Sequence, residues 1–522
     1  MPAINQFPQL KASSGASNVN FRPAASTGVV RTAQEKMRDF VSVMDFGAVG
    51  DGIADDTDAV NKALAALIDN QRGGTIYFPP GEYKMTSPLV IEPISGRDFV
   101  SDIHWQGAGG HHTDIATRIR LAGSAGSAGL TLKSAVQMSF DDIDFVGTTG
   151  SLAAVRTDTA GAIPFYSSIL ITFRNCRFAM VNPVKATVWV NNSVLVSFDN
   201  CFWNSLDTGT GSQILVQLGS DAADIGNAGT FGGGTNSCVS FKSCFIPGDV
   251  SIRRNRGLLF DTCVFDADAV TGIGGRIYGN GDQLNRGMIL NNCWAGYGNN
   301  TDTFLRMGTS GYDLKVTNCY IATYAKGILL NGVGVAHIEG NEFALNTSGA
   351  EAIHVLTTNF YGATVQNNHY AGMHATSTFV RDDRSSPGTP TAIAPVEVNA
   401  NLDLDATADM TGYAAVLTQS IKLTGGLYRI QSMITISTGA TASVFRARVN
   451  LGSQTPRVGG SIYIPANQTS TLTICRDVYL EGTSTATTAS LEVHQVTAGT
   501  AATIEATDTI NTTMLQMTRA TG

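Results

Sequence analysis

One short pattern of apolar and polar residues recurs along the middle of the chain. It has six positions: an apolar residue, a polar residue, Asn or a small residue, Cys or Asn, any residue, and an aromatic or apolar residue. Clear copies are Phe173–Phe178 and Phe198–Trp203, and a weaker copy is Phe140–Phe145. Further copies begin at Phe241, Phe260, Leu290, Val316, Ile338 and Val365. The fourth positions lie roughly 20–30 residues apart, with one longer gap, which is typical of a solenoid.

These repeats predict an all-β fold in which each copy belongs to one coil of a right-handed parallel β-helix. The apolar segments are short, rich in β-branched and aromatic residues, and interrupted by Gly and Asn. We expect positions one, four and six to point into the core. Asn at position three tolerates the left-handed backbone conformation and marks a bend. The cysteines at position four act as small apolar residues, and we expect them to be reduced.

The pattern changes on either side of the repeats and divides the chain. Residues 1–40 are polar and weakly periodic, which indicates a docking or linker segment. The β-helix is expected over 41–385, with an N-terminal capping helix at about 55–70. Residues 386–397 are rich in Pro and Ala and are expected to form a linker. Residues 398–522 show the alternation of a C-terminal antiparallel β-sandwich.

Composition limits the partners of the protein. The chain has 522 residues, 34 Lys and Arg against 42 Asp and Glu, and a net charge of −8, so no nucleic acid partner is expected. No run of about 18 apolar residues is present, so no membrane insertion is expected. The N-terminus has no secretory signal pattern. The eight cysteines contain no C-x-x-C pair, so the sequence predicts no cofactor and no metal site.

The segment before the repeats resembles a known family. Val43–Gly52, followed by Asp55–Thr57 and by Pro79–Tyr83, is similar to the opening of the pectate-lyase-like superfamily of parallel β-helices. Gly28–Arg38 is similar to the junction that precedes this opening in bacteriophage tailspikes. The resemblance therefore implies a homotrimeric tailspike, or capsule depolymerase.

What the resemblance implies for function is a virion protein that binds and depolymerises a bacterial surface polysaccharide, either capsule or O-antigen. Such a protein is made in the host cytoplasm and acts at the bacterial cell surface. Its partners would be the polysaccharide, further copies of itself, and a phage tail or adaptor protein reached through the N-terminal segment. The C-terminal sandwich would serve trimerisation or carbohydrate contact.

Polygalacturonases share the same opening, and their catalytic constellation is incomplete here. Asn300-Thr301-Asp302 matches their first motif, but the Asp-Asp pair, the Gly-His-Gly and the Arg-Ile-Lys are missing. Pectin hydrolysis by that constellation is therefore rejected, and a loop turn is the simpler role for the motif.

Acids for glycoside hydrolysis can be placed by counting along the repeats. Asp249 and Asp268 each lie five residues after the fourth-position cysteine of their repeat. If no bulge intervenes, they stand on successive rungs about 5 Å apart, with Asp266 on the same face. Two acids at such a distance suit acid/base cleavage, although Asp is also common in turns. Asp302 and Glu342 are reserve acids.

Substrate-binding groups are expected on the outward rows near these acids. The arginines could hold acidic groups of a glycan, or could neutralise the neighbouring acids. The aromatic residues at the fifth repeat position form a stripe suited to sugar stacking or to a subunit interface. The candidates are Arg253, Arg276, Tyr278, Trp294, Arg306 and Tyr320. Two alternatives stay open: a polysaccharide lyase that uses Tyr278 with an arginine, and a non-catalytic receptor-binding adhesin.

Overall fold

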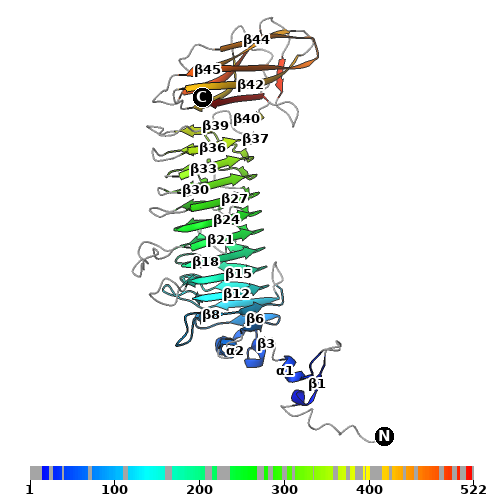
Figure 1. Cartoon of the computed structure of the whole chain (residues 1–522), viewed down its shortest axis with the longest axis vertical. Helices are drawn as coiled ribbons and strands as arrows, with labels where there is room; N and C mark the ends of the chain where they lie inside the picture. The colour runs from blue at the N-terminus through cyan, green and yellow to red at the C-terminus, as the bar shows by residue number, and fades with distance from the viewer. Residues whose placement is uncertain are drawn as a thin grey trace, which may run out of the picture. The chain divides into compact units, whose positions relative to one another are not determined.

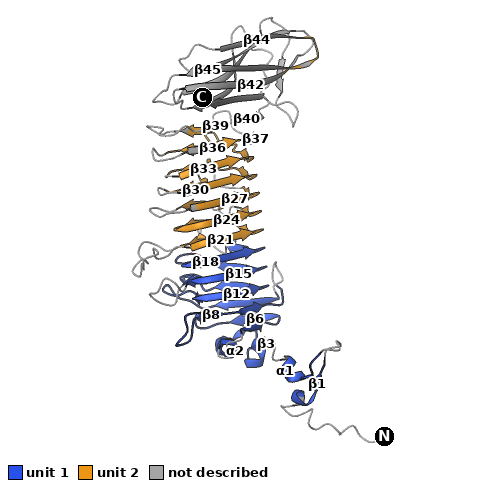
Figure 2. Ribbon diagram, in the orientation of Figure 1, with its two compact units in different colours: residues 1–207, 226–233 blue, residues 208–225, 234–522 orange. Residues whose placement is uncertain are grey.

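The computed structural model forms two compact units, which are coloured separately in Figure 2. Unit 1 contains residues 1–207 and 226–233, and unit 2 contains residues 208–225 and 234–522. The structure describes residues 15–22, 28–37, 40–68, 73–109, 116–158, 167–205, 214–219, 236–266, 275–279, 286–296, 302–308, 312–332, 334–356, 362–371, 377–382, 392–393, 396–399, 414–421, 426–438, 443–451, 457–480, 487–495, 502–505 and 513–519.

Unit 1 begins with short elements and a helix. The predicted docking segment contains η2 (Gly15–Asn18), β1 (Asn20–Phe21), β2 (Arg31–Thr32) and α1 (Ala33–Met37). After η3 (Val43–Phe46), α2 (Thr57–Ile68) packs a face of Ala and Leu side chains inward. At the start of α2, the otherwise unpaired N–H of Thr57 is bonded to the Asp55 carboxylate at 3.0 Å. The predicted capping helix is confirmed (Figure 1).

Three parallel sheets form the coils of unit 1, because neighbouring strands come from successive coils. The first sheet contains β3 (Phe40–Ser42), β5 (Gly74–Tyr77), β9 (Ile103–Gln106), β12 (Ala135–Asp141), β15 (Ser168–Arg174) and β18 (Ser193–Asp199), with β8 (Val100–Ser101) beside β12. The second contains β4 (Asp51–Asp55), β6 (Gly81–Lys84), β10 (Thr117–Leu121), β13 (Asp144–Gly147), β16 (Arg177–Met180) and β19 (Phe202–Ser205). The third contains β7 (Leu89–Ile91), β11 (Leu130–Lys133), β14 (Val155–Asp158) and β17 (Val188–Val190).

Unit 2 also contains three parallel sheets, so the predicted β-helix is confirmed in both units. Its first sheet contains β21 (Asn236–Lys242), β24 (Asn255–Asp261), β27 (Arg286–Asn291), β30 (Tyr312–Thr317), β33 (Gly334–Glu339), β36 (Gly362–Gln366) and β39 (Ala392–Ile393). Its second contains β22 (Phe245–Ile246), β25 (Val264–Phe265), β28 (Trp294–Ala295), β31 (Tyr320–Ala322), β34 (Glu342–Ala344), β37 (Asn368–Ala371) and β40 (Val396–Asn399). Its third contains β20 (Ile214–Leu218), β23 (Asp249–Ile252), β26 (Ile277–Gly279), β29 (Thr303–Met307), β32 (Lys326–Leu330), β35 (Glu351–Val355) and β38 (Thr378–Asp382).

The C-terminal part of unit 2 forms two antiparallel sheets, as predicted. One contains β41 (Ala414–Ile421), β43 (Ser443–Leu451), β44 (Arg457–Ile464) and β46 (Thr487–Gln495). The other contains β42 (Gly426–Thr438), β45 (Thr469–Leu480), β47 (Ala502–Glu505) and β48 (Thr513–Arg519). The predicted linker at 386–397 is wrong in part, because β39 and β40 pair in parallel with β36 and β37 and extend the β-helix beyond residue 385.

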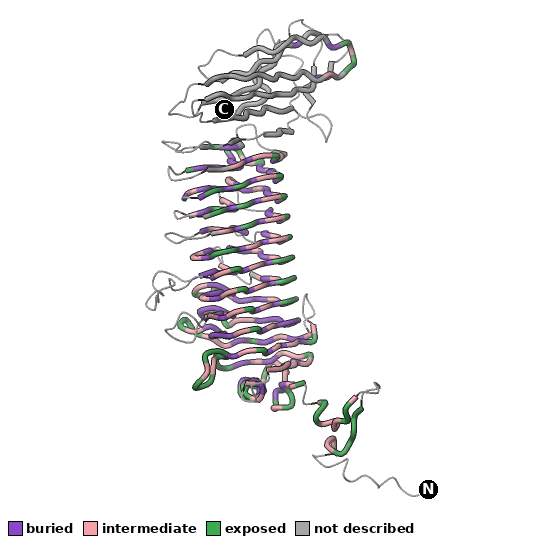
Figure 3. The backbone as a smooth tube through the Cα atoms, viewed as in Figure 1, coloured by how far each residue is buried: buried purple, intermediate pink, exposed green. Residues whose placement is uncertain are grey.

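The hexamer pattern maps onto the coil as the sequence predicts. Every third position has a left-handed backbone, with φ between 51° and 66°. These residues are Asn175, Asn200, Ser243, Thr262, Asn292, Asn318, Gly340 and Asn367. The described side chains at positions one, four and six are buried, with at most 3% exposure. Figure 3 shows the resulting alternation of buried and exposed residues along the strands of both units.

Stacked side chains fill the core along the coil axis. In unit 1, Phe173 stacks on Phe140 and on Phe198, with ring centroids 4.8 Å and 5.0 Å apart. The cysteines at position four are buried free thiols, and their Sγ atoms lie within hydrogen-bonding reach of main-chain carbonyls, as with Cys176 and the Phe140 oxygen at 3.2 Å. Hydrogen bonding between neighbouring thiols, together with burial, raises the pKa of Cys263 and keeps it neutral.

The left-handed bend gives a first prediction. Thr262 has a φ of 55°, which is unfavourable for a β-branched residue, whereas Asn adopts this conformation readily. We expect Thr262→Asn to raise the free energy of unfolding by about 1 kcal/mol in a urea titration. The matched control is Thr317→Asn, which lies within strand β30 and should bring no gain. Equal effects in both variants would contradict the assigned cause.

Candidate functional site

The register of the third sheet in unit 2 changes the predicted row of acids. Val250 pairs with Ile277, and Ser251 pairs with Tyr278, so the rung neighbour of Asp249 is Arg276. Residues 266–276 separate β25 from β26, whereas only residues 247 and 248 separate β22 from β23. Counting residues from the fourth-position cysteines therefore gives the wrong rung neighbour for Asp249, because the turns after β22 and β25 differ in length. Asp268 itself lies outside the described residues.

Arg276 joins two carboxylates from the coils on either side of it. Its Nε and Nη2 donate to Oδ1 and Oδ2 of Asp249 at 2.9 Å and 2.6 Å, which is a bidentate ion pair. Its Nη1 donates to Asp302 Oδ1 at 2.9 Å. The side chains of Asp249, Arg276 and Asp302 are 3%, 24% and 18% exposed. Asp302 is thus the more accessible acid, and Asp249 lies beneath it.

Burial and charge shift the pKa values of Asp249 and Arg276. Burial raises the pKa of Asp249, and the hydrogen bonds and charge of Arg276 oppose that rise. The Asp249 hydrogen bond raises the pKa of Arg276, so the guanidinium stays charged. One cation between two carboxylates leaves a net negative charge at the surface of this site.

The turn before β26 completes the site. Gly275 has a φ of 62°, and a Cβ at this position would lie 2.6 Å from the Asp266 carbonyl oxygen and 3.0 Å from Tyr324 Oη. Tyr324 is buried and donates to the Gly275 carbonyl at 2.9 Å. Desolvation raises the pKa of Tyr324, and the charge of the half-buried Asp266 adds to the rise. The structure therefore brings together Asp249, Arg276 and Asp302 from the predicted set, and it places Asp266 beside Gly275 and Tyr324.

The other predicted binding residues lie on nearby rows. Tyr278 pairs in register with Arg306, which is exposed, while the half-buried Arg253 follows the end of β23. Burial, with the charge of Asp249, raises the pKa of Tyr278 to about 12, so its hydroxyl is protonated at neutral pH.

The structure places Trp294 and Tyr320 of the predicted aromatic stripe in one row of the second sheet. Trp294 pairs with Tyr320, and Tyr320 pairs with Glu342, on three successive strands. The rings of Trp294 and Tyr320 are stacked, with centroids 6.1 Å apart and planes 10° apart. All three side chains are partly exposed, so the stripe can present ring faces and one carboxylate to a ligand.

One charged cluster was missed by sequence reasoning. Glu351, at the start of β35, contacts Lys326 from β32 and Arg381 from β38 as well as His354 on its own strand. The strands of this cluster, β32, β35 and β38, belong to the same sheet as β23, which carries Asp249. The signal was present, because Lys326 and Glu351 lie 25 residues apart, which is one coil. Counting along the hexamer does not locate the start of β35, because the hexamer ends in the second sheet and β35 belongs to the third.

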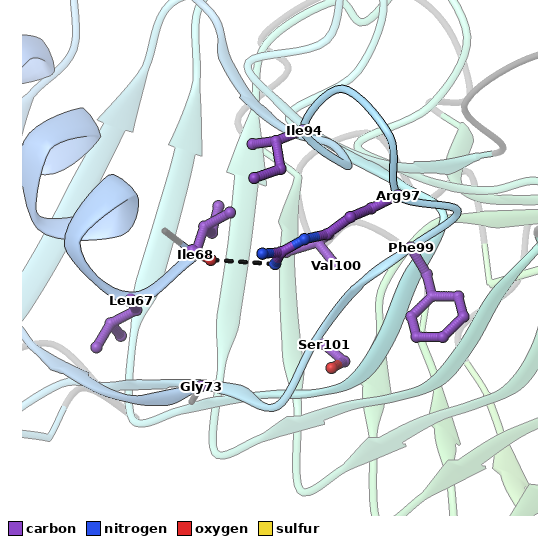
Figure 4. Close-up of a pocket in the computed structure, with 8 residues that line it drawn as sticks. All are labelled: Leu67, Ile68, Gly73, Ile94, Arg97, Phe99, Val100 and Ser101. Carbon is purple, nitrogen blue, oxygen red and sulfur yellow. Dashed lines mark hydrogen bonds between the residues drawn. The ribbon is translucent and has the colours of Figure 1, made fainter. Parts of the chain in front are cut away.

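Unit 1 contains a cleft of about 220 Å³ between the end of α2 and the loop before β8. Arg97 reaches across it and donates to the Ile68 carbonyl at 3.3 Å, which caps the helix (Figure 4). Leu67, Ile94 and Phe99 give it apolar walls. Its volume is below the range of about 300–1,000 Å³ that is usual for ligand sites, and it holds no pair of acids.

Two properties concern the described part of the chain only. Within it, no group of three or more His, Cys, Asp or Glu side chains is arranged to bind a metal ion. No helix there has the length and the apolar character needed to cross a membrane.

Comparison with known proteins covers the beginning of the β-helix. The family model "Rhamnogalacturonase A/epimerase, pectate lyase-like" matches residues 40–129. The opening of the β-helix is therefore similar to that of the pectate lyase-like family. Mannuronan C5-epimerase AlgE2 of Azotobacter vinelandii is 43% identical over 75 residues, which are 14% of this chain and 7% of that protein. Plasmin and fibronectin-binding protein A of Streptococcus pneumoniae is 51% identical over 52 residues, or 10% of this chain and 7% of that protein.

Similar solved structures include bacteriophage tailspikes. A tailspike mutant of E. coli bacteriophage HK620 has a TM-score of 0.42 at 13% identity and covers 94% of this chain and 99% of its own. The Dettilon tailspike has a TM-score of 0.44 at 12% identity, and the match covers 89% of this chain and 95% of the Dettilon chain.

Within the pectate lyase-like opening, the acids of the motif have structural partners. Asp56 is fully buried, and its carboxylate accepts the N–H groups of Val49 at 2.6 Å and of Gly50 and Lys84 at 3.3 Å. Hydrogen bonds from Thr57 and Thr86 lower the pKa of Asp55 to about 2. The motif thus ties α2 to the first coils, and the matched segment does not include Asp249, Arg276 or Asp302.

Proposed function

We propose that this protein is a phage tailspike that binds and depolymerises a bacterial surface polysaccharide by acid/base glycoside hydrolysis. The observation that carries the proposal is the accessible Asp302 carboxylate, held by Arg276 above the buried Asp249. The stacked Trp294 and Tyr320 on the preceding sheet supply faces on which sugar rings can stack. The pectate lyase-like opening and the tailspike-like junction of the sequence agree with this function.

In this proposal, Asp302 is the acid that meets the glycan, and the half-buried Asp266 is the candidate for the second acid. Asp249 is too buried and too fully bonded by Arg276 to reach a glycosidic oxygen, so its role is to position the guanidinium. Arg276 in turn fixes Asp302, and the N–H groups of Ala325 and Lys326 hold the Asp302 carbonyl at 3.0 Å and 3.2 Å. Such fixed acids lose little freedom when substrate binds.

The remaining partners follow from the same proposal. Leu170 and Leu195, 43% and 45% exposed, stand on adjacent strands of the first sheet in unit 1 and supply apolar surface for a homotrimer contact. The N-terminal segment would attach the trimer to a phage tail or adaptor protein. The protein would then reside in the virion and act at the bacterial cell surface.

The test is cleavage of capsule or O-antigen from a sensitive strain by the purified protein, followed by size-exclusion chromatography and a reducing-end assay. We expect shorter chains with new reducing ends, and a rate about 100-fold lower for Asp302→Asn, because an acid/base group contributes at least this much. The matched control is Asp313→Asn, which removes an exposed acid from β30 and should leave the rate unchanged. Unshortened polymer would favour an adhesin, and a product with a new ultraviolet absorbance from an unsaturated sugar would favour a lyase.

A further inference from the structure

The cluster around Glu351 carries more positive than negative charge. Arg381 Nη1 lies 2.7 Å from Glu351 Oε1, and His354 Nδ1 lies 2.7 Å from Oε2. Lys326 Nζ contacts the same Oε2 and lies 2.9 Å from His354 Nδ1. Two permanent cations and one imidazole therefore surround a single carboxylate.

Hydrogen bonds and charge keep that carboxylate ionised. Although burial opposes ionisation, His354, Lys326 and Arg381 lower the pKa of Glu351 to about 2. With Glu351 at −1, the cluster has a net charge of +1 before any proton on His354 is counted. This excess is unusual in a chain whose overall charge is −8.

The excess charge is located at the surface. The side chains of Lys326 and Arg381 are 32% and 47% exposed, whereas those of Glu351 and His354 are only 8% and 5% exposed. The acid therefore forms the floor, and the two cations face solvent above it. Register places these residues on three successive strands, with Lys326 beside Glu351 and His354 beside Arg381.

From this arrangement we propose that Lys326 and Arg381 bind an oxyanion carried by the glycan, either a sugar carboxylate or a sulfate ester. The ammonium of Lys326 and the guanidinium of Arg381 come from strands two rungs apart and converge on the one Glu351 carboxylate, so both can donate to an oxyanion bound above it. The backbone N–H of Lys326 also bonds to the Asp302 carbonyl at 3.2 Å, so this anion site borders the proposed acids. The inference deepens the proposed function by naming the polysaccharide as acidic, and it needs no cleavage to be tested.

The experiment measures binding of the full chain to three probes by isothermal titration calorimetry at constant low ionic strength: oligogalacturonate, dextran sulfate and neutral dextran. We expect binding of at least one anionic probe and none of neutral dextran. Lys326→Gln and Arg381→Gln should each weaken anion binding about tenfold, the usual effect of losing one charge-assisted hydrogen bond. Comparing the two anionic probes decides between carboxylate and sulfate.

Two controls separate this site from general charge and from misfolding. Lys315→Gln removes an exposed lysine from β30 and should bind like the unchanged protein. Lys326→Arg keeps the charge and should retain binding. The inference is overturned if Lys326→Gln and Arg381→Gln bind as tightly as Lys315→Gln, or if neutral dextran binds equally well. Since Asp302→Asn should still bind the anion, failure of hydrolysis and failure of this site give different results.

Discussion

Replacing Arg276 by Met should lower the free energy of unfolding of unit 2 by about 3–5 kcal/mol, the usual cost of removing one partner from a buried ion pair. Asp249 is 2% exposed, and both of its oxygens are bonded by Arg276. Without the guanidinium, Asp249 becomes a buried charge that also faces Asp302. The measurement is a urea titration at neutral pH, read by intrinsic fluorescence.

The loss should depend on pH in a defined direction. Burial already raises the pKa of Asp249 in the folded protein. Replacing Arg276 removes the hydrogen bonds and the positive charge that oppose this rise. A folded pKa above the unfolded one gives stability that is fully present below the unfolded pKa and is lost as pH rises through the folded pKa. Arg276→Met should therefore be least destabilising in acid, near pH 4 or about the unfolded pKa of Asp.

Arg306→Met provides the comparison for Arg276→Met. Arg306 is an exposed arginine on the next strand of the same sheet, so its replacement should change the free energy of unfolding by less than about 0.5 kcal/mol. Equal stability of the two variants would mean that the Asp249–Arg276 pair contributes nothing to the fold. A loss that grows in acid would mean that the buried charge is not Asp249.

The repeats were sufficient to predict the coil because each hexamer includes both the bend between two sheets and the residues that point into the core. A left-handed residue at position three, as in Asn175 and Asn318, turns the chain between two sheets and forces positions four and six inward. The aromatic row through Trp294 and Tyr320 followed from the same count. These positions all lie within a few residues of the bend, so no loop of unknown length intervenes.

The acid row could not be predicted, because it lies beyond a turn whose length varies between coils. Asp249 follows β22 after a short turn, whereas the chain passes through residues 266–276 before β26. The sequence contains the carboxylates and the arginine. Counting residues cannot show which of them are neighbours on successive coils when the turns between the strands differ in length. Variable turn length also prevents the sequence from locating the strand that carries Lys326, one coil before Glu351. The sequence also gave no measure of burial that would distinguish Asp249 from Asp302.

Phe173→Ala should lower the free energy of unfolding of unit 1 by about 3–5 kcal/mol, which is typical for a buried phenylalanine that leaves a cavity. Phe173 is 0% exposed, and besides its two stacked partners it makes an edge contact with Phe178 at 5.5 Å. The rungs are held at fixed spacing by main-chain hydrogen bonds, so the neighbouring coils cannot collapse into the space. The effect should appear in a urea titration as an earlier unfolding transition.

Two further variants decide whether the stack itself is responsible for that loss. Phe173→Leu refills most of the volume and should cost about 1–2 kcal/mol, the range for hydrophobic changes that largely conserve volume. Leu170→Ala changes a side chain of the same strand that is 43% exposed, and should cost well under half of the Phe173→Ala effect. If Leu170→Ala were the more damaging change, the exposed face of β15 would contribute more to stability than the aromatic core. The stability of the coil would then depend on contacts between copies of the chain, because within one chain an exposed leucine has less apolar area to lose.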